Sequence, residues 1–219
     1  MCGRFAGLSY NEVAQVVAEI QQGILSSAAP GWSEDGADVR PGSRAWAIAP
    51  LVDSRANDSL ALELVPRELT WGFAVDWSKR PVFNTRIETA TGSNPGMWRD
   101  AMRNGRCIVP SRWFYEPHAV ETVPSPTLGK PMKRQYQFEM PDGGVLLMAA
   151  VMQDGRFSIV TTEPNAAVAP IHDRMPLVLR FSEVKTWLGD GFGSLADRSD
   201  VLLKSSAEPL PERSQLSLF

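Results

Sequence analysis

Cys2 is the residue of this chain with the most specific chemical potential. Initiator methionine is commonly removed before a small second residue, and loss of Met1 would leave Cys2 with an α-amine and a thiol on adjacent carbons. The α-amine titrates at ~7.7–8.0, against ~10.4 for lysine, so part of it is free base at neutral pH. It can form a Schiff base with an aldehyde, after which the thiol can close a five-membered thiazolidine ring. The alternative is an incidental cysteine at position 2.

Two other side chains suit acid–base chemistry. Glu116 ends the aromatic run Trp113–Tyr115, and a carboxyl group buried there would have a raised pKa. His172, one of only two histidines, lies between two prolines, and histidine is the natural proton shuttle near neutral pH. The alternatives are a strand-end Glu116 that faces water and a purely structural His172.

Residues 82–89 mix polar side chains of very different kinds in a strand-like segment. Asn84 and Arg86 share one face of such a strand because side chains alternate with a period of two. An amide and a guanidinium on one face could orient a reacting group and hold a phosphate. The alternative is a strand flanked by a structural Arg–Glu pair. Cys107 is interpreted as a core cysteine, and no role is assigned to His118.

These residues need elements that position them, and the first helix is the clearest of these. Ser9 and Glu12 form a capping box, valine and isoleucine follow at helical spacing, and Gly23 marks the stop. Residues 25–43 are rich in Ser, Gly, Pro and Asp, which predicts a long surface loop.

Short strands dominate the rest of the chain, with short helices predicted at Met97–Asn104 and Ser182–Leu188. We expect an α+β fold in which residues 1–204 form a single domain. Its sheet is predicted to be mostly antiparallel and barrel-like, with a few flanking helices. Residues 205–219 are expected to be a flexible tail. The predicted strands are Ala45–Ala49, Leu60–Val65, Thr70–Val75, Gly105–Val109, Trp113–Glu116, Gln135–Met140, Val145–Met152 and Phe157–Thr162.

Composition restricts the function classes. The 219 residues are 43% apolar, and no apolar run approaches the roughly 20 residues that cross a bilayer. The start lacks a signal-peptide pattern, which favours the cytoplasm. Two cysteines and no zinc-type spacing predict neither a disulfide nor a metal site, and no cofactor is expected. The net charge of −3 argues against a bulk nucleic-acid coat, but residues 61–140 hold 11 basic and 8 acidic side chains. These basic side chains line either a basic groove or an ordinary solvated surface.

The combined motifs are more specific than any one of them. In order and spacing they resemble the SRAP (SOS-response-associated peptidase) family, from residue 2 to about residue 190. Members of that family form covalent crosslinks to abasic sites in single-stranded DNA and shield them at stalled replication forks. The motifs are Met1–Phe5 (MCGRF), Trp71–Phe73 (WGF), Asn84–Thr89 (NTRIET), Arg106–Pro110 (RCIVP), Trp113–Glu116 (WFYE) and Ile171–Pro176 (IHDRMP).

The resemblance implies four catalytic residues. Cys2, freed of Met1, would attack the open-chain aldehyde of the abasic sugar and close a thiazolidine. His172 would assist in opening the sugar ring and resolving the Schiff base. Glu116 would position and deprotonate the α-amine, and Asn84 would orient Cys2 or the sugar.

The resemblance also implies a DNA-binding set. Arg4, Arg86 and Arg174 match positions that hold the DNA backbone, and Trp71 matches one that packs against a base. Such contacts bind without sequence preference. The sequence departs from the family pattern at residues 37–41 (ADVRP) and at Pro117, where the family often has tryptophan. We expect both departures to alter the affinity for DNA more than the reaction at Cys2.

The last residues carry a second resemblance. Gln215, Leu216, Leu218 and Phe219 are similar to the pentapeptide with which bacterial replication proteins bind the β sliding clamp. Two apolar anchors and one amide would dock in an apolar cleft, at the end of a proline-containing tether.

The leading hypothesis is a cytoplasmic, monomeric sensor of abasic sites that crosslinks to single-stranded DNA at replication forks. One alternative is a cysteine peptidase that uses Cys2, Glu116 and His172, which includes removal of its own Met1. Another is a non-catalytic clamp-bound adaptor. An abasic-site lyase activity is also compatible, since any Schiff base at the sugar acidifies the neighbouring C–H bond.

Overall fold

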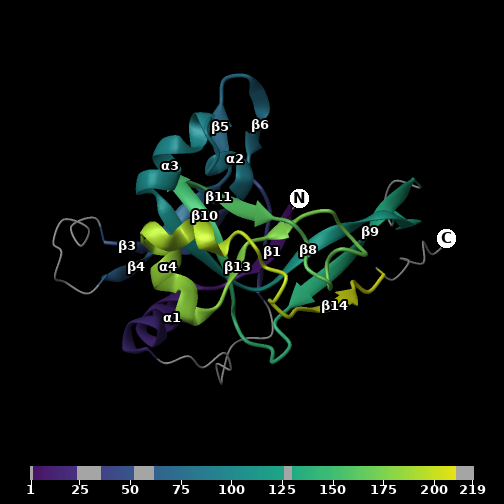
Figure 1. Cartoon of the computed structure of the whole chain (residues 1–219). Helices are drawn as coiled ribbons and strands as arrows, with labels where there is room; N and C mark the ends of the chain where they lie inside the picture. Colours follow the sequence, from purple (N-terminus) through teal and green to yellow (C-terminus); the bar gives the residue numbers. More distant parts are fainter. Residues whose placement is uncertain (1, 24–35, 52–61, 126–129, 211–219) are drawn as a thin grey trace, which may run out of the picture.

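The computed structural model describes residues 2–23, 36–51, 62–125 and 130–210. Within them, a twelve-stranded mixed sheet carries a few short helices, which confirms the α+β class (Figure 1). The strands of this sheet are β1 (Arg4–Gly7), β2 (Ala37–Val39), β3 (Arg44–Pro50), β4 (Leu64–Trp71), β7 (Asn84–Arg86), β8 (Arg106–Pro124), β9 (Pro131–Glu139), β10 (Leu146–Gln153), β11 (Arg156–Thr162), β12 (Met175–Pro176), β13 (Val178–Leu179) and β14 (Lys204–Ala207).

The 19-residue strand β8 organises the sheet. It pairs antiparallel with β1, β3, β9 and β10. The other ladders are also antiparallel, except that β11 runs parallel to β4 and to β7. Because β10 pairs with both β11 and β8, the sheet bends back on itself. The expected barrel-like form is present as this curvature, without a closed regular barrel.

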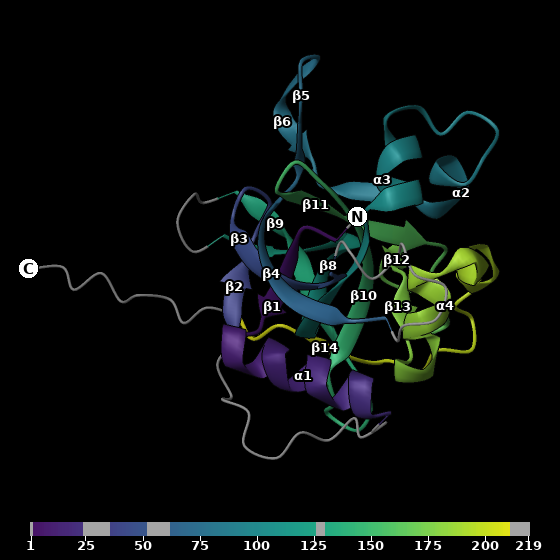
Figure 2. The same ribbon diagram turned by 90° about the vertical axis from the view of Figure 1, so that its left-hand side faces the viewer.

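Helix α1 (Tyr10–Gln22) forms as predicted. Ser9 accepts a hydrogen bond from the Glu12 amide, and the Glu12 carboxylate accepts one from the Ser9 amide. Gly23 ends the helix with a φ of 69°, a conformation that glycine adopts without strain. The helix buries its valines against the sheet. In both views it lies at the opposite end of the molecule from the hairpin of β5 (Phe73–Val75) and β6 (Ser78–Val82) (Figure 1, Figure 2).

The predicted short helices are also present. The segment predicted at Met97–Asn104 forms the turn η2 (Gly96–Trp98) and helix α3 (Arg99–Asn104). The one predicted at Ser182–Leu188 forms the turn η3 (Phe181–Glu183) and helix α4 (Val184–Leu188). The remaining short elements are α2 (Ile87–Ala90) and η4 (Asp190–Leu195).

Several predicted strand breaks were wrong. The runs 105–109 and 113–116 belong to one strand because Pro110 and Ser111 keep extended backbone and stay paired with β10. Pro66 likewise continues β4, and the break comes at Gly72, where φ is 106°. Of the expected loop over 25–43, residues 25–35 lie outside the described residues, and Ala37–Val39 forms β2 against β1.

The C-terminal segment departs from the expected tail. Residues 204–207 form β14, paired with β9, so the segment is ordered where the tail was predicted to begin. The clamp-like residues Gln215, Leu216, Leu218 and Phe219 lie outside the described residues. Among the described helices, none is long and apolar enough to cross a membrane.

Candidate active site around Cys2

Cys2 lies just before β1, and its side chain is fully buried in an apolar cluster with Phe5 and Trp71. Antiparallel pairing sets Arg4 opposite Tyr115, which brings the start of β1 next to Glu116 on β8. The Cys2 thiol lies 3.7 Å from the Arg4 carbonyl oxygen. A cysteine held in this way is part of the folded core.

Asn84 fixes the backbone of Cys2. Its Nδ2 donates a hydrogen bond of 2.8 Å to the Cys2 carbonyl oxygen, across 82 positions of sequence. The amide is placed by β7, where Asn84 stands opposite Ile159 of β11. The Asn84 Oδ1 is buried and has no hydrogen-bond partner among the described residues. This acceptor is available for a donor that enters the site.

Glu116 and His172 form the other side of the site. The Glu116 side chain is fully buried, and its Oε2 lies 3.8 Å from His172 Nε2. His172 stands on the turn after β11, where its amide donates to the Val168 carbonyl and its Nδ1 accepts from the Arg174 amide. The turn therefore aims Nε2 at Glu116. The four residues predicted to be catalytic lie together, although they come from four separate segments.

Burial shifts all three titratable groups toward their neutral forms. It raises the pKa of the Glu116 carboxyl to about 8, with the positive amino terminus of the chain acting in the opposite direction. It raises the pKa of the Cys2 thiol above its ordinary value, and the negative Glu116 adds to this rise. Burial, followed by the positive amino terminus, lowers the pKa of His172. At neutral pH the site therefore holds a thiol, a carboxylic acid and a neutral imidazole.

The structure contradicts the base-packing role predicted for Trp71. Its side chain is fully buried, and its Nε1 donates to the Phe83 carbonyl at 2.8 Å. Its ring packs 5.0 Å from that of Phe5 and is stacked with that of Phe157. Trp71 therefore supports the start of β1 from within the core and cannot meet a base.

The three predicted DNA-binding arginines lie in different environments. Arg174 is 8% exposed and is held by both carboxylate oxygens of Glu88 and by the Thr161 carbonyl, so its phosphate contact stays a prediction. Arg4 is ion-paired and lies over the Tyr115 ring. Arg86 is exposed at the end of β7.

Trp77 was not among the residues that the sequence predicted to bind DNA. It lies in the turn of the β5–β6 hairpin and is 74% exposed, followed by the exposed residues Lys79 and Arg80. The hairpin projects from the body of the molecule (Figure 2). An aromatic residue in a short turn next to two basic residues was the available signal, and it suits a nucleic-acid contact.

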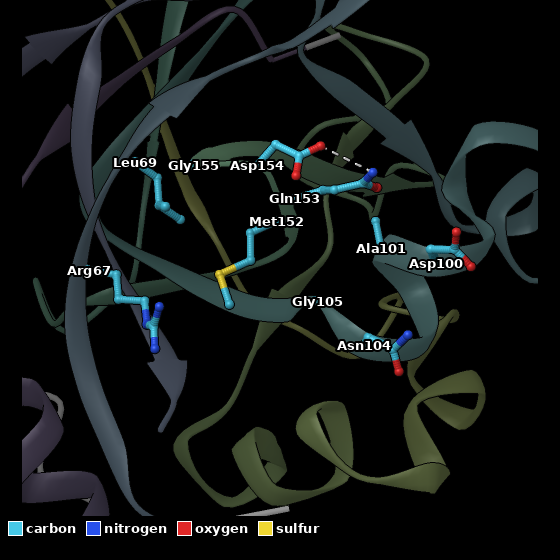
Figure 3. A pocket seen from close by; sticks show the side chains of 10 residues that line it. All are labelled: Arg67, Leu69, Asp100, Ala101, Asn104, Gly105, Met152, Gln153, Asp154 and Gly155. Carbon is cyan, nitrogen blue, oxygen red and sulfur yellow. Dashed lines mark hydrogen bonds between the residues drawn. The ribbon is translucent and has the colours of Figure 1, made fainter. Parts of the chain in front are cut away.

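Two surface hollows bear on the search for a substrate site. One of about 300 Å³ is lined by Gly3, Arg4, Arg40, Tyr115, Pro117, Met132, Gln135 and Glu208, which include the neighbours of Cys2 and Glu116. Another, of about 480 Å³, lies among β4, α3 and the β10–β11 turn (Figure 3). It holds Arg67, Asp100 and Asp154 but none of the residues predicted to react. The described residues contain no group of three or more side chains placed to hold a metal ion.

The family described as SOS response associated peptidase (SRAP) matches residues 1–214. The chain belongs to the SRAP family. Similar proteins include the abasic site processing protein YedK of Escherichia coli, 28% identical over 200 residues, which cover 86% of this chain and 79% of that one. The abasic site processing protein YoqW of Bacillus subtilis is 25% identical over 202 residues, which cover 86% and 80%. The resemblance stated from the motifs is thus confirmed.

Solved structures show the same fold. A phage-related protein of Bordetella bronchiseptica matches with a TM-score of 0.63 and 24% identity over 94% of this chain and 93% of that one. A second Bordetella bronchiseptica protein matches with a TM-score of 0.61 and 21% identity, over 95% and 100%. At these identities the likeness concerns the fold alone.

Proposed function

We propose that this SRAP-family chain processes abasic sites in single-stranded DNA by forming a covalent thiazolidine through Cys2, after Met1 is removed. The observation that carries the proposal is the hydrogen bond from Asn84 to the Cys2 carbonyl, with Glu116 close enough to act on the Cys2 thiol and His172 3.8 Å from Glu116. The names of the relatives, abasic site processing proteins, support the same substrate.

The α-amine acts first. While Met1 is attached, the Cys2 nitrogen is an amide and is not nucleophilic. Once free, the amine adds to the aldehyde carbon of the opened abasic sugar, and the resulting carbinolamine loses water to give a protonated imine. Protonated Glu116 supplies the proton that leaves with the hydroxyl group.

The thiol acts second. Its sulfur adds to the carbon of the protonated imine, and its proton passes to the carboxylate that Glu116 has become. The nitrogen keeps the proton it already carries and takes back the electron pair of the C=N bond as the ring closes. The balance is one aldehyde and one aminothiol giving one thiazolidine and one water. Nothing is oxidised or reduced.

His172 connects Glu116 to solvent. Its side chain is 16% exposed, whereas that of Glu116 is fully buried. A neutral imidazole with Nδ1 bonded to the Arg174 amide carries its proton on Nε2, the atom that faces Glu116. His172 can therefore return a proton to Glu116 and assist ring opening of the sugar.

The raised thiol pKa speaks against the peptidase alternative. A cysteine peptidase keeps its nucleophile as a thiolate, which neighbouring positive charge stabilises. Cys2 is buried, and the nearby Glu116 charge raises its pKa further. The crosslinking route does not need a resident thiolate, because the amine makes the first attack.

We propose that DNA contacts come from exposed groups at the end of β7 and in the β5–β6 hairpin. Arg86 and the hairpin residues Trp77, Lys79 and Arg80 offer positive charge and one aromatic face. Such groups hold a strand through its phosphates and stack on any base, so we expect no sequence preference.

The test is a denaturing gel of the purified protein, with Met1 removal verified by intact mass, incubated with single-stranded DNA that has one abasic site. We expect a shifted band that survives without borohydride and a mass equal to protein plus DNA minus one water. Cys2→Ala should lose the band, and Cys107→Ala, a change of the other buried cysteine, should keep it. Because Cys2→Ala keeps an α-amine, we expect it to cleave more strands by β-elimination. A stable band in Cys2→Ala, or turnover of peptides without any band, would contradict the proposal.

A further inference from the structure

The guanidinium of Arg4 is held by two carboxylates from distant parts of the chain. Its Nη1 lies 2.6 Å from Glu208 Oε1, and its Nε lies 2.6 Å from Asp38 Oδ1. Its plane is further supported by the Tyr115 ring, whose centroid is 4.0 Å from Arg4 Cζ. This arrangement fixes the position of the guanidinium.

Glu208 reaches Arg4 because the C-terminal segment is part of the sheet. β14 pairs with β9, and the Glu208 amide continues this ladder by donating to the Gln135 carbonyl at 2.9 Å. The Glu208 side chain is 29% exposed. It can therefore leave Arg4 for water without breaking the strand that carries it.

The ion pair lines the hollow of about 300 Å³ described above. Gly3, which follows Cys2 directly, lines the same hollow, as do Tyr115 and Pro117 on either side of Glu116. Arg4 and Arg40 supply two positive charges there, and Asp38 and Glu208 cancel them. A strand whose abasic sugar reaches Cys2 brings its phosphates close to this hollow.

We propose that a phosphate of the DNA strand binds Arg4 in competition with the Glu208 carboxylate, and that this competition sets the selectivity for damaged strands. The inference rests on the proposed function. A phosphodiester presents two anionic oxygens to a guanidinium, as a carboxylate does. An undamaged strand must displace Glu208 from Arg4 and gains little binding free energy by doing so, so it is released. An abasic strand is retained by the covalent bond, which does not depend on the strength of that ion pair.

The first experiment measures the affinity of the Met1-free protein for an undamaged, fluorescent single-stranded oligonucleotide at low salt. We expect Glu208→Gln to bind about three- to tenfold more tightly than wild type. Glu139→Gln is the matched control, since it removes one carboxylate that pairs with Lys204 at 2.9 Å in the same β9–β14 ladder. It should bind within about twofold of wild type. Equal affinity of the two variants would overturn the inference.

The second experiment locates the effect at Arg4. Arg4→Gln should weaken binding, and Glu208→Gln should have no further effect in that background, because its competitor role needs the guanidinium. A competition assay mixes the protein with a limiting amount of abasic strand and an excess of undamaged strand. The undamaged strand should slow crosslinking by Glu208→Gln more than crosslinking by wild type. The inference is contradicted if Glu208→Gln still increases DNA affinity in the Arg4→Gln background. It is also contradicted if excess undamaged strand slows crosslinking of wild type and Glu208→Gln equally. If wild-type protein forms the crosslink but Glu208→Gln binds undamaged DNA no more tightly, only this inference is wrong. If no crosslink forms at all, the proposed function is wrong as well.

Discussion

Glu116 shows how burial sets the protonation of single residues in this site. The carboxyl group is enclosed by β8 and the His172 turn, and its pKa is raised to about 8. The folded protein therefore keeps a proton that the unfolded chain releases above about pH 4.5. The stability tied to this proton is complete below about pH 4.5 and is lost as the pH rises to about 8. The same proton is the one that the proposed dehydration step uses.

We predict that Glu116→Gln removes this pH dependence. Glutamine has nearly the same shape and stays neutral, so the melting temperature of the variant should exceed that of wild type by about 5 °C or more at pH 9, with a smaller difference at pH 4.5. Thermal unfolding at both values, followed by circular dichroism, measures this. Glu121→Gln, which removes an exposed carboxylate from the same strand, should show no such change between the two values. Parallel melting curves for wild type and Glu116→Gln at both pH values would refute the assignment.

At the scale of elements, the turn after β11 decides where His172 points. Asn165 organises this turn, since its Oδ1 accepts from the amides of Ala167 and Val168, and its Nδ2 donates to the Val201 carbonyl at 2.6 Å. The side chain is 4% exposed. The turn is also joined to β8, where the Ala119 amide donates to the Ile171 carbonyl, and the buried Asn165 amide fixes its other side.

We predict that Asn165→Ala costs about 2 kcal/mol of stability, because it leaves buried backbone groups without partners. This corresponds to a fall in melting temperature of roughly 4–8 °C. The crosslinking rate should fall as well, since His172 is less well oriented. Asn165→Asp, which keeps the acceptor and loses the donor, should be intermediate. Asn94→Ala, at an exposed loop position, serves as the control, and an Asn165→Ala protein as stable as this control would show that the turn is held by other means.

At the scale of the molecule, one sheet holds both β1 and β14, the first and last strands of the described residues. β1 carries Arg4, β14 leads to Glu208, and β9 lies between the body and the C-terminal segment (Figure 1). The described chain ends two residues after Glu208, which lines the hollow beside Gly3. A clamp-binding peptide at residues 215–219 would hold the Cys2 site near DNA that threads the clamp.

We predict that the double substitution Leu218→Ala and Phe219→Ala abolishes capture of the chain by the β sliding clamp, because it removes both apolar anchors. Crosslinking to a free abasic oligonucleotide should be unchanged, since the tail makes no part of the proposed chemistry. Leu210→Ala, in the same segment but outside the peptide, should be captured as wild type is. Clamp capture that is indifferent to the double substitution would exclude the tail as the docking element.

The sequence by itself determined the features that follow from local rules. The capping box of α1, most strand positions and the α+β class depend on residues near one another in the chain, and the motifs were sufficient to indicate the SRAP family. The four residues predicted to react also lie together, with Asn84 bonded to Cys2 and Glu116 facing His172.

The tertiary structure alone decided which side chains are available. Trp71 and Arg174 have residue types that suit DNA binding, yet one is enclosed by Phe5 and Phe157 and the other is paired with Glu88 across 86 positions of sequence. The contact of Arg4 with Glu208 spans 204 positions. Burial and ion pairing of this kind arise only when the sheet brings distant segments together. The residues next to an arginine or tryptophan in the sequence therefore do not indicate which side chain will pack against it.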